Sequence, residues 1–321
     1  MMSPGDAKLG RHTATILLCF LGISIAAGAS GGSQRRTEDA SAGMAAGASD
    51  SALSVDPTTP AAPAAPVLGG LLVAPTRLVF EGRQRTGQLT LVNTGARAAT
   101  YRISLVRLRM TETGGFREVQ DPDSAERFAD TLVRFSPRRV ELPPNVPQTV
   151  RLQVRLPADL PAGEYRSHLL FRAVPAGEPE DTAGAGPATE LQLTLRAVYG
   201  VSIPIIVRQG VLVAGVSLSD PRVERVPDAE PPERLTVTLN RSGDRSVYGD
   251  LRAVLVREGQ PDLVVGMAKG LAVYTPNPRR TCVLPLRLPP ALDASARLRV
   301  RFDPAPGVTE IPPAEASVAL R

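Results

Sequence analysis

The chain has 321 residues, 43% of them apolar, so it is long enough for about two domains with cores of their own. Aromatic residues make up 4% and tryptophan is absent, so those cores must consist of Val, Leu, Ile and Ala. The 31 prolines and 28 glycines favour many turns and few long helices. A net charge of +5 could favour binding to nucleic acid. The arginines alternate with apolar residues along predicted strands, however, which indicates a solvated sheet face and no nucleic-acid partner.

Residues 1–29 have the layout of a secretory signal peptide. A positively charged start precedes an apolar run over 13–27, and Ala27-Gly28-Ala29 offers a small-residue cleavage site. The run of about 15 apolar residues is short for a membrane span, which needs about 20. We expect cleavage after Ala29, export to the periplasm and no stable membrane insertion afterwards. The alternative is an uncleaved membrane anchor.

We interpret residues 30–68 as a disordered tether. The stretch is rich in Ala, Gly, Ser and Pro and carries no periodic apolar pattern. Such a segment buries too little apolar surface to offset the entropy that ordering costs. It separates the expected signal peptide from the first folded domain.

A continuous β pattern predicts an N-terminal Ig-like domain over residues 69–208. Apolar Val150 and Leu152 flank Arg151, the alternation of a half-buried strand. The expected strands are Leu71–Val79, Thr86–Asn93, Ala99–Met110, Leu132–Leu142, Gln148–Leu156, Glu164–Ala173 and Glu190–Val207. Short strands joined by Gly, Pro and Asn turns are typical of an immunoglobulin-like sandwich.

Three segments interrupt this pattern. Ser124–Asp130 could form one helical turn, and Pro175–Thr189 is an acidic loop rich in Gly, Ala and Pro. Near Arg208–Val211 the apolar alternation breaks, and Gly210 permits a bend. We therefore expect a hinge at this last position.

A second set of strands over residues 209–321 predicts a C-terminal β-sandwich domain. Its expected strands are Leu212–Leu218, Arg234–Asn240, Gly249–Val256, Leu263–Ala268, Thr281–Leu288, Ala296–Arg301 and Ala316–Leu320. The two sets together predict an all-β chain with two immunoglobulin-like β-sandwich domains in tandem.

The sequence carries no recognisable catalytic or metal-binding constellation. After signal removal it keeps one histidine, His168, and one cysteine, Cys282, which cannot form a zinc site or an intramolecular disulfide. Cys282 alternates with apolar neighbours, so we expect a buried strand thiol. No serine elbow or phosphate-binding glycine loop is evident. We therefore expect neither an enzyme nor a cofactor, and function must come from the shape and edges of the sandwich.

Five stretches of the first predicted domain share a resemblance to one family. They are Val73-Ala-Pro-Thr-Arg-Leu-Val-Phe80, Leu89-Thr-Leu-Val-Asn93, Tyr101-Arg-Ile103, Arg138–Leu152 and Leu160–Pro175. In this order, behind a signal peptide and before a second β domain, they resemble the periplasmic chaperones that assemble bacterial pili and fimbriae, the PapD-like family. The tether over 30–68 departs from that family, whose sandwich usually follows the signal closely.

The resemblance implies a periplasmic chaperone for pilus or fimbrial subunits. In this family the client is an Ig-like pilin that lacks its last strand, and the chaperone lends a strand of its own, a mechanism called donor-strand complementation. Backbone hydrogen bonds then supply affinity, and alternate side chains fill the open groove of the subunit. The chaperone delivers the subunit to an outer-membrane usher, which is the second partner implied.

The lent strand would carry Leu191, Leu193 and Leu195. A two-residue period places these three leucines on one face of a strand. The alternative is that they face the core of their own domain, because alternation looks the same in both cases.

The family also implies an anchor for the subunit's C-terminal carboxylate, made by two basic residues. Arg77 matches the first of them, although a solvated strand arginine is the alternative reading. The second is a lysine in the family, and its place here is taken by Gly200 or Ser202. Arg196 is the basic residue of that strand with the right parity, and it is the candidate for the second anchor.

A different class of function stays open, namely a secreted or surface Ig-like structural or adhesion module on the tether. A chaperone should copurify one-to-one with a subunit and remain in the periplasm. An adhesin should reach the cell surface and bind there without an usher.

Overall fold

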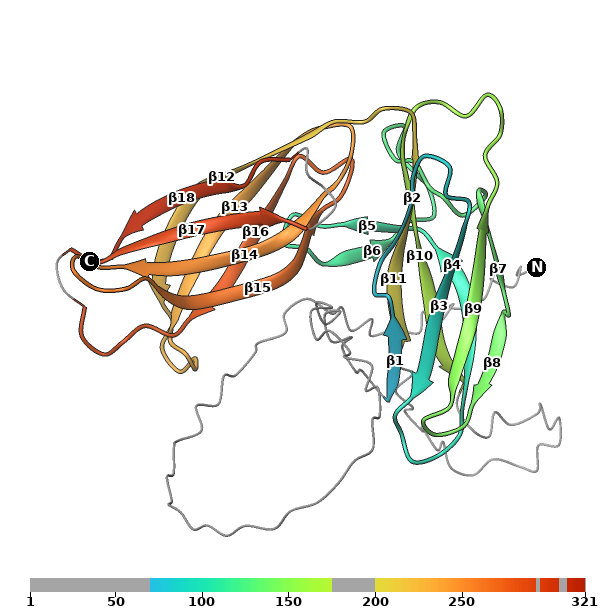
Figure 1. Cartoon of the computed structure of the whole chain (residues 1–321), viewed down its shortest axis with the longest axis horizontal. Coiled ribbons are helices and arrows are strands. Elements are labelled where there is room, and N and C mark those ends of the chain that lie inside the picture. The colour runs from blue at the N-terminus through green and yellow to red at the C-terminus, as the bar shows by residue number, and fades with distance from the viewer. Residues whose placement is uncertain (1–69, 175–199, 293–294, 306–310, 321) are drawn as a thin grey trace, which may run out of the picture.

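The computed structural model describes residues 70–174, 200–292, 295–305 and 311–320, and these form an all-β structure of two sandwiches (Figure 1). The predicted fold class is therefore confirmed. The expected signal peptide over 1–29, the tether over 30–68 and the loop Pro175–Thr189 lie outside the described residues. Within the described ranges no helix is long and apolar enough to cross a membrane.

The first sandwich consists of two sheets. One has the strand order β1-β3-β9-β7 and the other β2-β11-β10-β4-β8. The first sheet contains β1 (Leu71–Ala74), β3 (Thr86–Asn93), β9 (Pro147–Val154) and β7 (Val133–Ser136). The second contains β2 (Leu78–Phe80), β11 (Gly200–Gln209), β10 (Gly163–Val174), β4 (Ala99–Val106) and β8 (Arg139–Leu142).

The core of the first sandwich follows the alternation of the sequence. On β9, Val150 and Leu152 are buried at 0% and 2% exposure, whereas Arg151 between them is exposed. On β10, Leu169 and Phe171 point into the same core and are fully buried. Aliphatic residues make up most of this core, but Phe80 and Phe171 are also fully buried in it, so the expectation of a core of Val, Leu, Ile and Ala alone is wrong.

The second sandwich also consists of two sheets, with the orders β12-β13-β16 and β15-β14-β17-β18. They contain β12 (Ala214–Arg225), β13 (Glu233–Gly243), β16 (Arg279–Leu286), β15 (Leu263–Val273), β14 (Val247–Val256), β17 (Arg297–Pro304) and β18 (Ala314–Ala319). Cys282 lies in this core at 6% exposure, as predicted, and burial raises the pKa of its thiol.

The expected strand Leu71–Val79 is wrong, because it is two strands in different sheets. β1 pairs with β3, whereas β2 pairs in parallel with β11. Pro75 lies between them and has no N–H to continue a ladder, which explains why the chain leaves one sheet and joins the other there.

The expected strand Ala99–Met110 also divides, at Arg107. Its second part, β5 (Leu108–Met110), forms a hairpin with β6 (Phe116–Glu118), which the sequence pattern did not predict because only three residues pair. The helical turn expected at Ser124–Asp130 is absent, and this segment is irregular with a turn at 124–125. Figure 1 shows the hairpin projecting from the first sandwich toward the second.

An ion pair between the exposed side chain of Arg109 and the buried carboxylate of Glu126 holds the hairpin against the irregular segment that follows it. Arg109 donates from Nε and Nη2 to the two carboxylate oxygens of Glu126, at 2.7 and 2.6 Å. These hydrogen bonds hold the pKa of Glu126 below its ordinary value of 4.5. The pair therefore stabilises the fold fully above that ordinary pKa and ceases to do so as pH falls through the lower folded value.

We expect the melting temperature of Glu126→Gln to lie below that of the parent at neutral pH, because the variant loses the charged pair. The gap should close as pH falls through the lowered pKa of Glu126, where the carboxylate of the parent also becomes protonated. Thermal unfolding between about pH 7 and pH 3 checks this, with the exposed Glu118→Gln as the control. A gap that is independent of pH would contradict the assigned role.

Candidate functional site

The outer face of β2, β11 and β10 is turned toward the second sandwich. Every second residue of β10 points outward, which places Glu164, Arg166 and His168 on this face, while Tyr165 and Leu169 point into the core. The register pairs each of the three with an outward residue of β11, as Glu164↔Arg208, Arg166↔Ile206 and His168↔Pro204. A polar face that a solvated sheet would expose is thus covered by the other domain.

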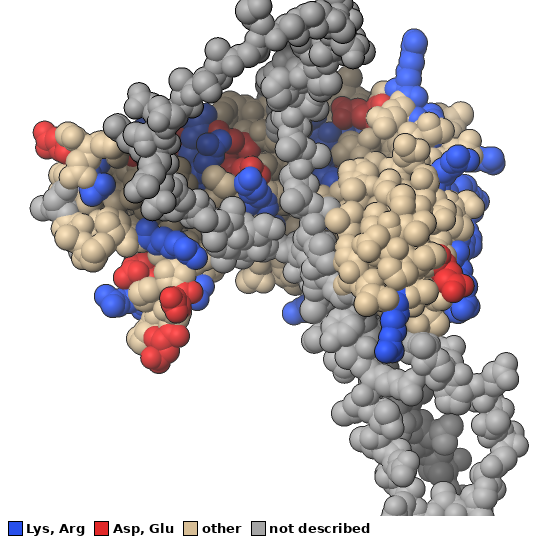
Figure 2. All heavy atoms as spheres, turned by 60° about the horizontal axis from the view of Figure 1, so that its bottom comes forward, with Lys and Arg blue, Asp and Glu red and all other residues tan. Residues whose placement is uncertain are grey.

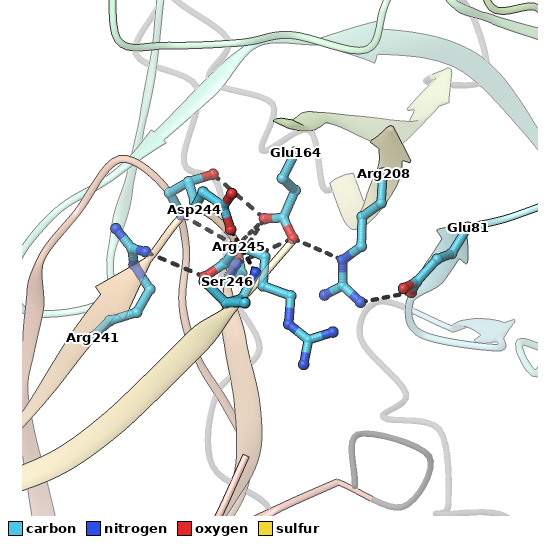
Figure 3. Close-up of polar contacts among 9 residues, drawn as sticks. Glu81, Glu164, Arg208, Arg241, Asp244, Arg245 and Ser246 are labelled. Atoms are coloured by element: carbon cyan, nitrogen blue, oxygen red, sulfur yellow. Dashed lines mark hydrogen bonds and ion pairs between the residues drawn. The ribbon is translucent and has the colours of Figure 1, made fainter. Parts of the chain in front are cut away.

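A buried network joins the two sandwiches at one end of this face (Figure 3). Arg208 donates from Nε to Glu164 at 3.0 Å and from Nη1 to Glu81 at 3.0 Å. From the second sandwich, the backbone N–H of Ser246 donates to both oxygens of Glu164 at 3.1 Å, and its hydroxyl also donates to that carboxylate. The side chains of Glu164 and Arg208 are 0% and 5% exposed. The carboxylate of Glu164 therefore bonds to both domains at a position that is buried from water.

An apolar cluster continues the interface beside this network. Ile206 and Val79 contribute from the first sandwich, and Tyr248, Ala272 and Tyr274 from the second. Met110 and Phe116 of the β5–β6 hairpin complete the cluster. The hairpin therefore acts as a third contact element between the domains.

The hairpin is also hydrogen-bonded to the second sandwich. The side-chain amide of Asn277 donates to the carbonyl of Met110 at 2.9 Å, and the backbone N–H of Thr281 donates to the carbonyl of Glu112 at 2.7 Å. Arg279 forms an exposed ion pair with Glu112 at 3.3 Å. These contacts fix the position of the second sandwich relative to the outer face of the first.

Arg77 lies at the edge of the covered face, where the chain passes from β1 to β2. It precedes Leu78, the residue paired with Ile205, so it lies at the level of Pro204 on β11. Its guanidinium stacks on the ring of Tyr248 at 4.6 Å. Nε and Nη2 of Arg77 are buried and have no hydrogen-bond partner among the residues that the structure describes. A half-buried cation with two buried donors that lack a partner is a site that an anion would complete.

Arg166 is a second arginine of this face, which sequence reasoning did not single out. It is 5% exposed, stacks on the ring of Tyr274 at 4.5 Å, and approaches Nδ1 of His168 at 3.4 Å through Nη1. Burial lowers the pKa of Arg166, and burial together with the positive charge of Arg166 lowers that of His168 well below 6.5. His168 is therefore neutral, and its Nδ1 accepts from Arg166 while the other ring nitrogen carries the hydrogen.

β11 has an open edge next to Arg77. β2 pairs only with Ile205, Ile206 and Val207, while β1 belongs to the other sheet. On the side that β2 occupies farther on, the stretch 200–204 of β11 therefore has no strand partner within the described ranges. Backbone groups at such an edge can accept another strand.

The remaining predicted site residues lie outside the described residues. These are Leu191, Leu193 and Leu195 of the expected donor strand and Arg196 of the expected anchor. The structure therefore places Arg77 alone of the sequence-predicted site residues. Gly200 and Ser202, which take the place of the family's lysine, both lie on β11 in the open stretch.

No protein-family model matches the sequence, and no curated protein matches it either. Among solved structures, the Pseudomonas aeruginosa CupB2 chaperone is similar with 16% identity and a TM-score of 0.38, over 78% of this chain and 100% of that chain. The Salmonella enterica SafB chaperone, in complex with the SafA pilin, has 17% identity and a TM-score of 0.37, over 79% and 99%. A chain of the CsuC–CsuE chaperone–tip adhesion subunit complex of Acinetobacter baumannii has 12% identity and a TM-score of 0.40, over 77% and 97%. Each of these structures contains a chaperone, together with a pilin in the Salmonella structure and a tip adhesion subunit in the Acinetobacter structure.

Proposed function

We propose that the chain is a periplasmic chaperone that binds a pilus or fimbrial subunit along the open edge of β11 and delivers it to an outer-membrane usher. The observation that carries the proposal is the coincidence of that edge with Arg77, whose buried N–H groups lack a partner among the described residues. An added strand would take its backbone hydrogen bonds from β11. Its terminal carboxylate would be held by the guanidinium at the end of the edge.

The domain arrangement supports this proposal. The second sandwich stacks Tyr248 against Arg77 and so holds the guanidinium in one orientation. The Glu164–Arg208 network and the hairpin fix the two domains against each other. A preorganised cation loses less freedom when the anion binds, which favours a tight complex.

The donor segment of the proposed mechanism is the stretch with Leu191, Leu193 and Leu195, directly before β11. Its leucines would fill the groove of the subunit, and Arg196 would be the second cation of the anchor. The proposed domains are a chaperone domain over residues 69–208 and a second sandwich over residues 209–321. Described strand β11 ends at Gln209 and β12 begins at Ala214, which agrees with a junction at the expected hinge.

The direct test is co-expression in a bacterial periplasm with a fimbrial subunit of the same genome that lacks its final strand. We expect a one-to-one complex that survives affinity purification and gel filtration. Recovery of the chain on the cell surface without bound subunit would contradict the proposal and favour the adhesion module.

We expect Leu193→Glu to weaken capture of this subunit about tenfold to a hundredfold, because one buried leucine contributes about 1.5–3 kcal/mol. The melting temperature of the isolated chaperone should change little, since the side chain would meet its partner only in the complex. Thr194→Glu, on the other face, is the matched control. A fall of several degrees in the melting temperature of Leu193→Glu would place this leucine in its own core and contradict its donor role.

A further inference from the structure

Three arginines stand side by side on the outer face of the β10–β4–β8 sheet. Arg172 of β10 is directly opposite Arg102 of β4, and Arg102 is directly opposite Arg139 of β8. All three are exposed. Directly opposed residues of an antiparallel pair have Cα atoms about 4.5–5.5 Å apart, so the row spans about 10 Å.

The row ends at Arg172, because the residue opposite Arg172 on β11 is Gly200, which has no side chain. It lies on the flat face of the sheet, whereas the proposed subunit site uses the edge of β11. The two surfaces can therefore be occupied at the same time. Arg172, Arg102 and Arg139 together form the arginine row.

The arginine row opposes folding. Arginine stays protonated at every physiological pH, and like charges directly opposite each other on a sheet destabilise it. Arg107 and Arg109, farther along the same chain segment, form ion pairs with Asp130 and Glu126. No ion pair joins a member of the arginine row to a carboxylate within the described ranges. Nothing described inside the fold therefore offsets the repulsion.

The surroundings show which anion fits. On β8 the next outward residue after Arg139 is the exposed Glu141, and Glu141 is opposite Thr100. On the other side, Ser104 and Leu170 form the adjacent pair. The positive charge is thus confined to a strip one residue wide. A flat anionic membrane would also meet Glu141, whereas a single chain can lie along the strip.

Figure 2 shows Lys and Arg side chains along the right-hand side of the first sandwich, interspersed with acidic side chains at its top and lower right. Guanidinium groups grip carboxylates bidentately, and the flexible stems let neighbouring groups follow carboxylates spaced about 6–7 Å apart along an extended chain. We propose that the arginine row is a docking site for an acidic polypeptide segment of a partner protein. This site is distinct from the edge of β11 and does not depend on the proposed subunit binding.

The test uses the mature full chain and a fluorescent peptide of about ten residues in which Glu and Ala alternate, with binding followed by anisotropy at about 50 mM salt. We expect Arg102→Gln, the middle of the row, to weaken binding about tenfold, since it removes the shared central contact. The matched control is Arg151→Gln, an equal loss of charge on the opposite sheet, which should leave binding unchanged. Arg102→Gln should also raise the melting temperature by about 1–2 °C, because it removes like-charge repulsion.

Several results would overturn the proposal. No binding by the parent, or equal weakening by Arg102→Gln and Arg151→Gln, would show only general attraction to a basic protein. Vesicles with anionic lipid that bind in an Arg102-dependent way, without peptide binding, would assign the row to a membrane. Peptide binding that requires neutralising Glu178, Glu180 and Asp181 together would show that the chain's own acidic stretch is the occupant.

Discussion

Replacing Glu164 by alanine is expected to lower the free energy of unfolding by about 3–5 kcal/mol, the usual cost of leaving one member of a buried ion pair alone. The carboxylate of Glu164 is fully buried and accepts from Arg208 and from the backbone and hydroxyl of Ser246. Its removal leaves the buried guanidinium of Arg208 with the half-exposed Glu81 as its ion-pair partner and frees the β13–β14 turn of the second sandwich. Denaturant unfolding of the variant and its parent measures the difference.

Glu81 provides the matched control, because it is bonded to the same guanidinium from the opposite side. Its side chain is 54% exposed, and the pair Arg208–Glu81 resembles a surface salt bridge. Glu81→Ala should therefore cost only about 0–1 kcal/mol. If both variants lost the same amount, burial of Glu164 would not be the cause, and the role of this network in joining the domains would be refuted.

Replacing Arg77 by alanine is expected to weaken subunit binding by about thirtyfold or more, since truncating one partner of a buried charge-assisted pair costs about 2–5 kcal/mol. Isolated protein should lose little stability, because the described contact of this guanidinium is its stacking on Tyr248. Arg77→Lys should rescue binding poorly, since an ammonium cannot form the bidentate fork. Affinity for the purified subunit and the melting temperature of the free chain are the two readouts.

Arg83→Ala is the control for Arg77, because it removes the same charge from an exposed turn between β2 and β3. It should leave subunit affinity unchanged. If Arg77→Ala greatly lowered the melting temperature, and subunit affinity fell only as much as this loss of stability explains, Arg77 would be a structural residue of the domain interface.

Strand alternation predicted most of the fold, because burial on one side of a sheet dictates the two-residue pattern. The expected strand Thr86–Asn93 matches β3, and the buried position of Cys282 was predicted from its apolar neighbours. The same rule failed between Leu71 and Val79, where a proline moves the chain from one sheet to the other without changing the pattern of the side chains. Local periodicity reports which face is buried and not which sheet the strand joins.

The candidate site was predicted only in part. Arg77 came from the resemblance to a family, and the structure adds that it faces Tyr248 of the second domain. Glu164, Arg166 and Arg208 were missed, because their alternation is that of a solvated face. The available signal was that β10 has charged residues on one face and apolar residues on the other. The covering of the charged face by the second domain depends on contacts between distant segments, which no local pattern encodes.

Hydrogen–deuterium exchange on the free chain and on its complex with a strand-lacking fimbrial subunit tests the central claim most directly. We expect amide exchange to slow in the segment 191–204, because the added strand would pair with the open edge of β11. The exposed turn at 258–260 of the second sandwich should exchange equally fast in both states. A stable complex in which 191–204 exchanges as it does in the free chain would contradict strand addition at this edge.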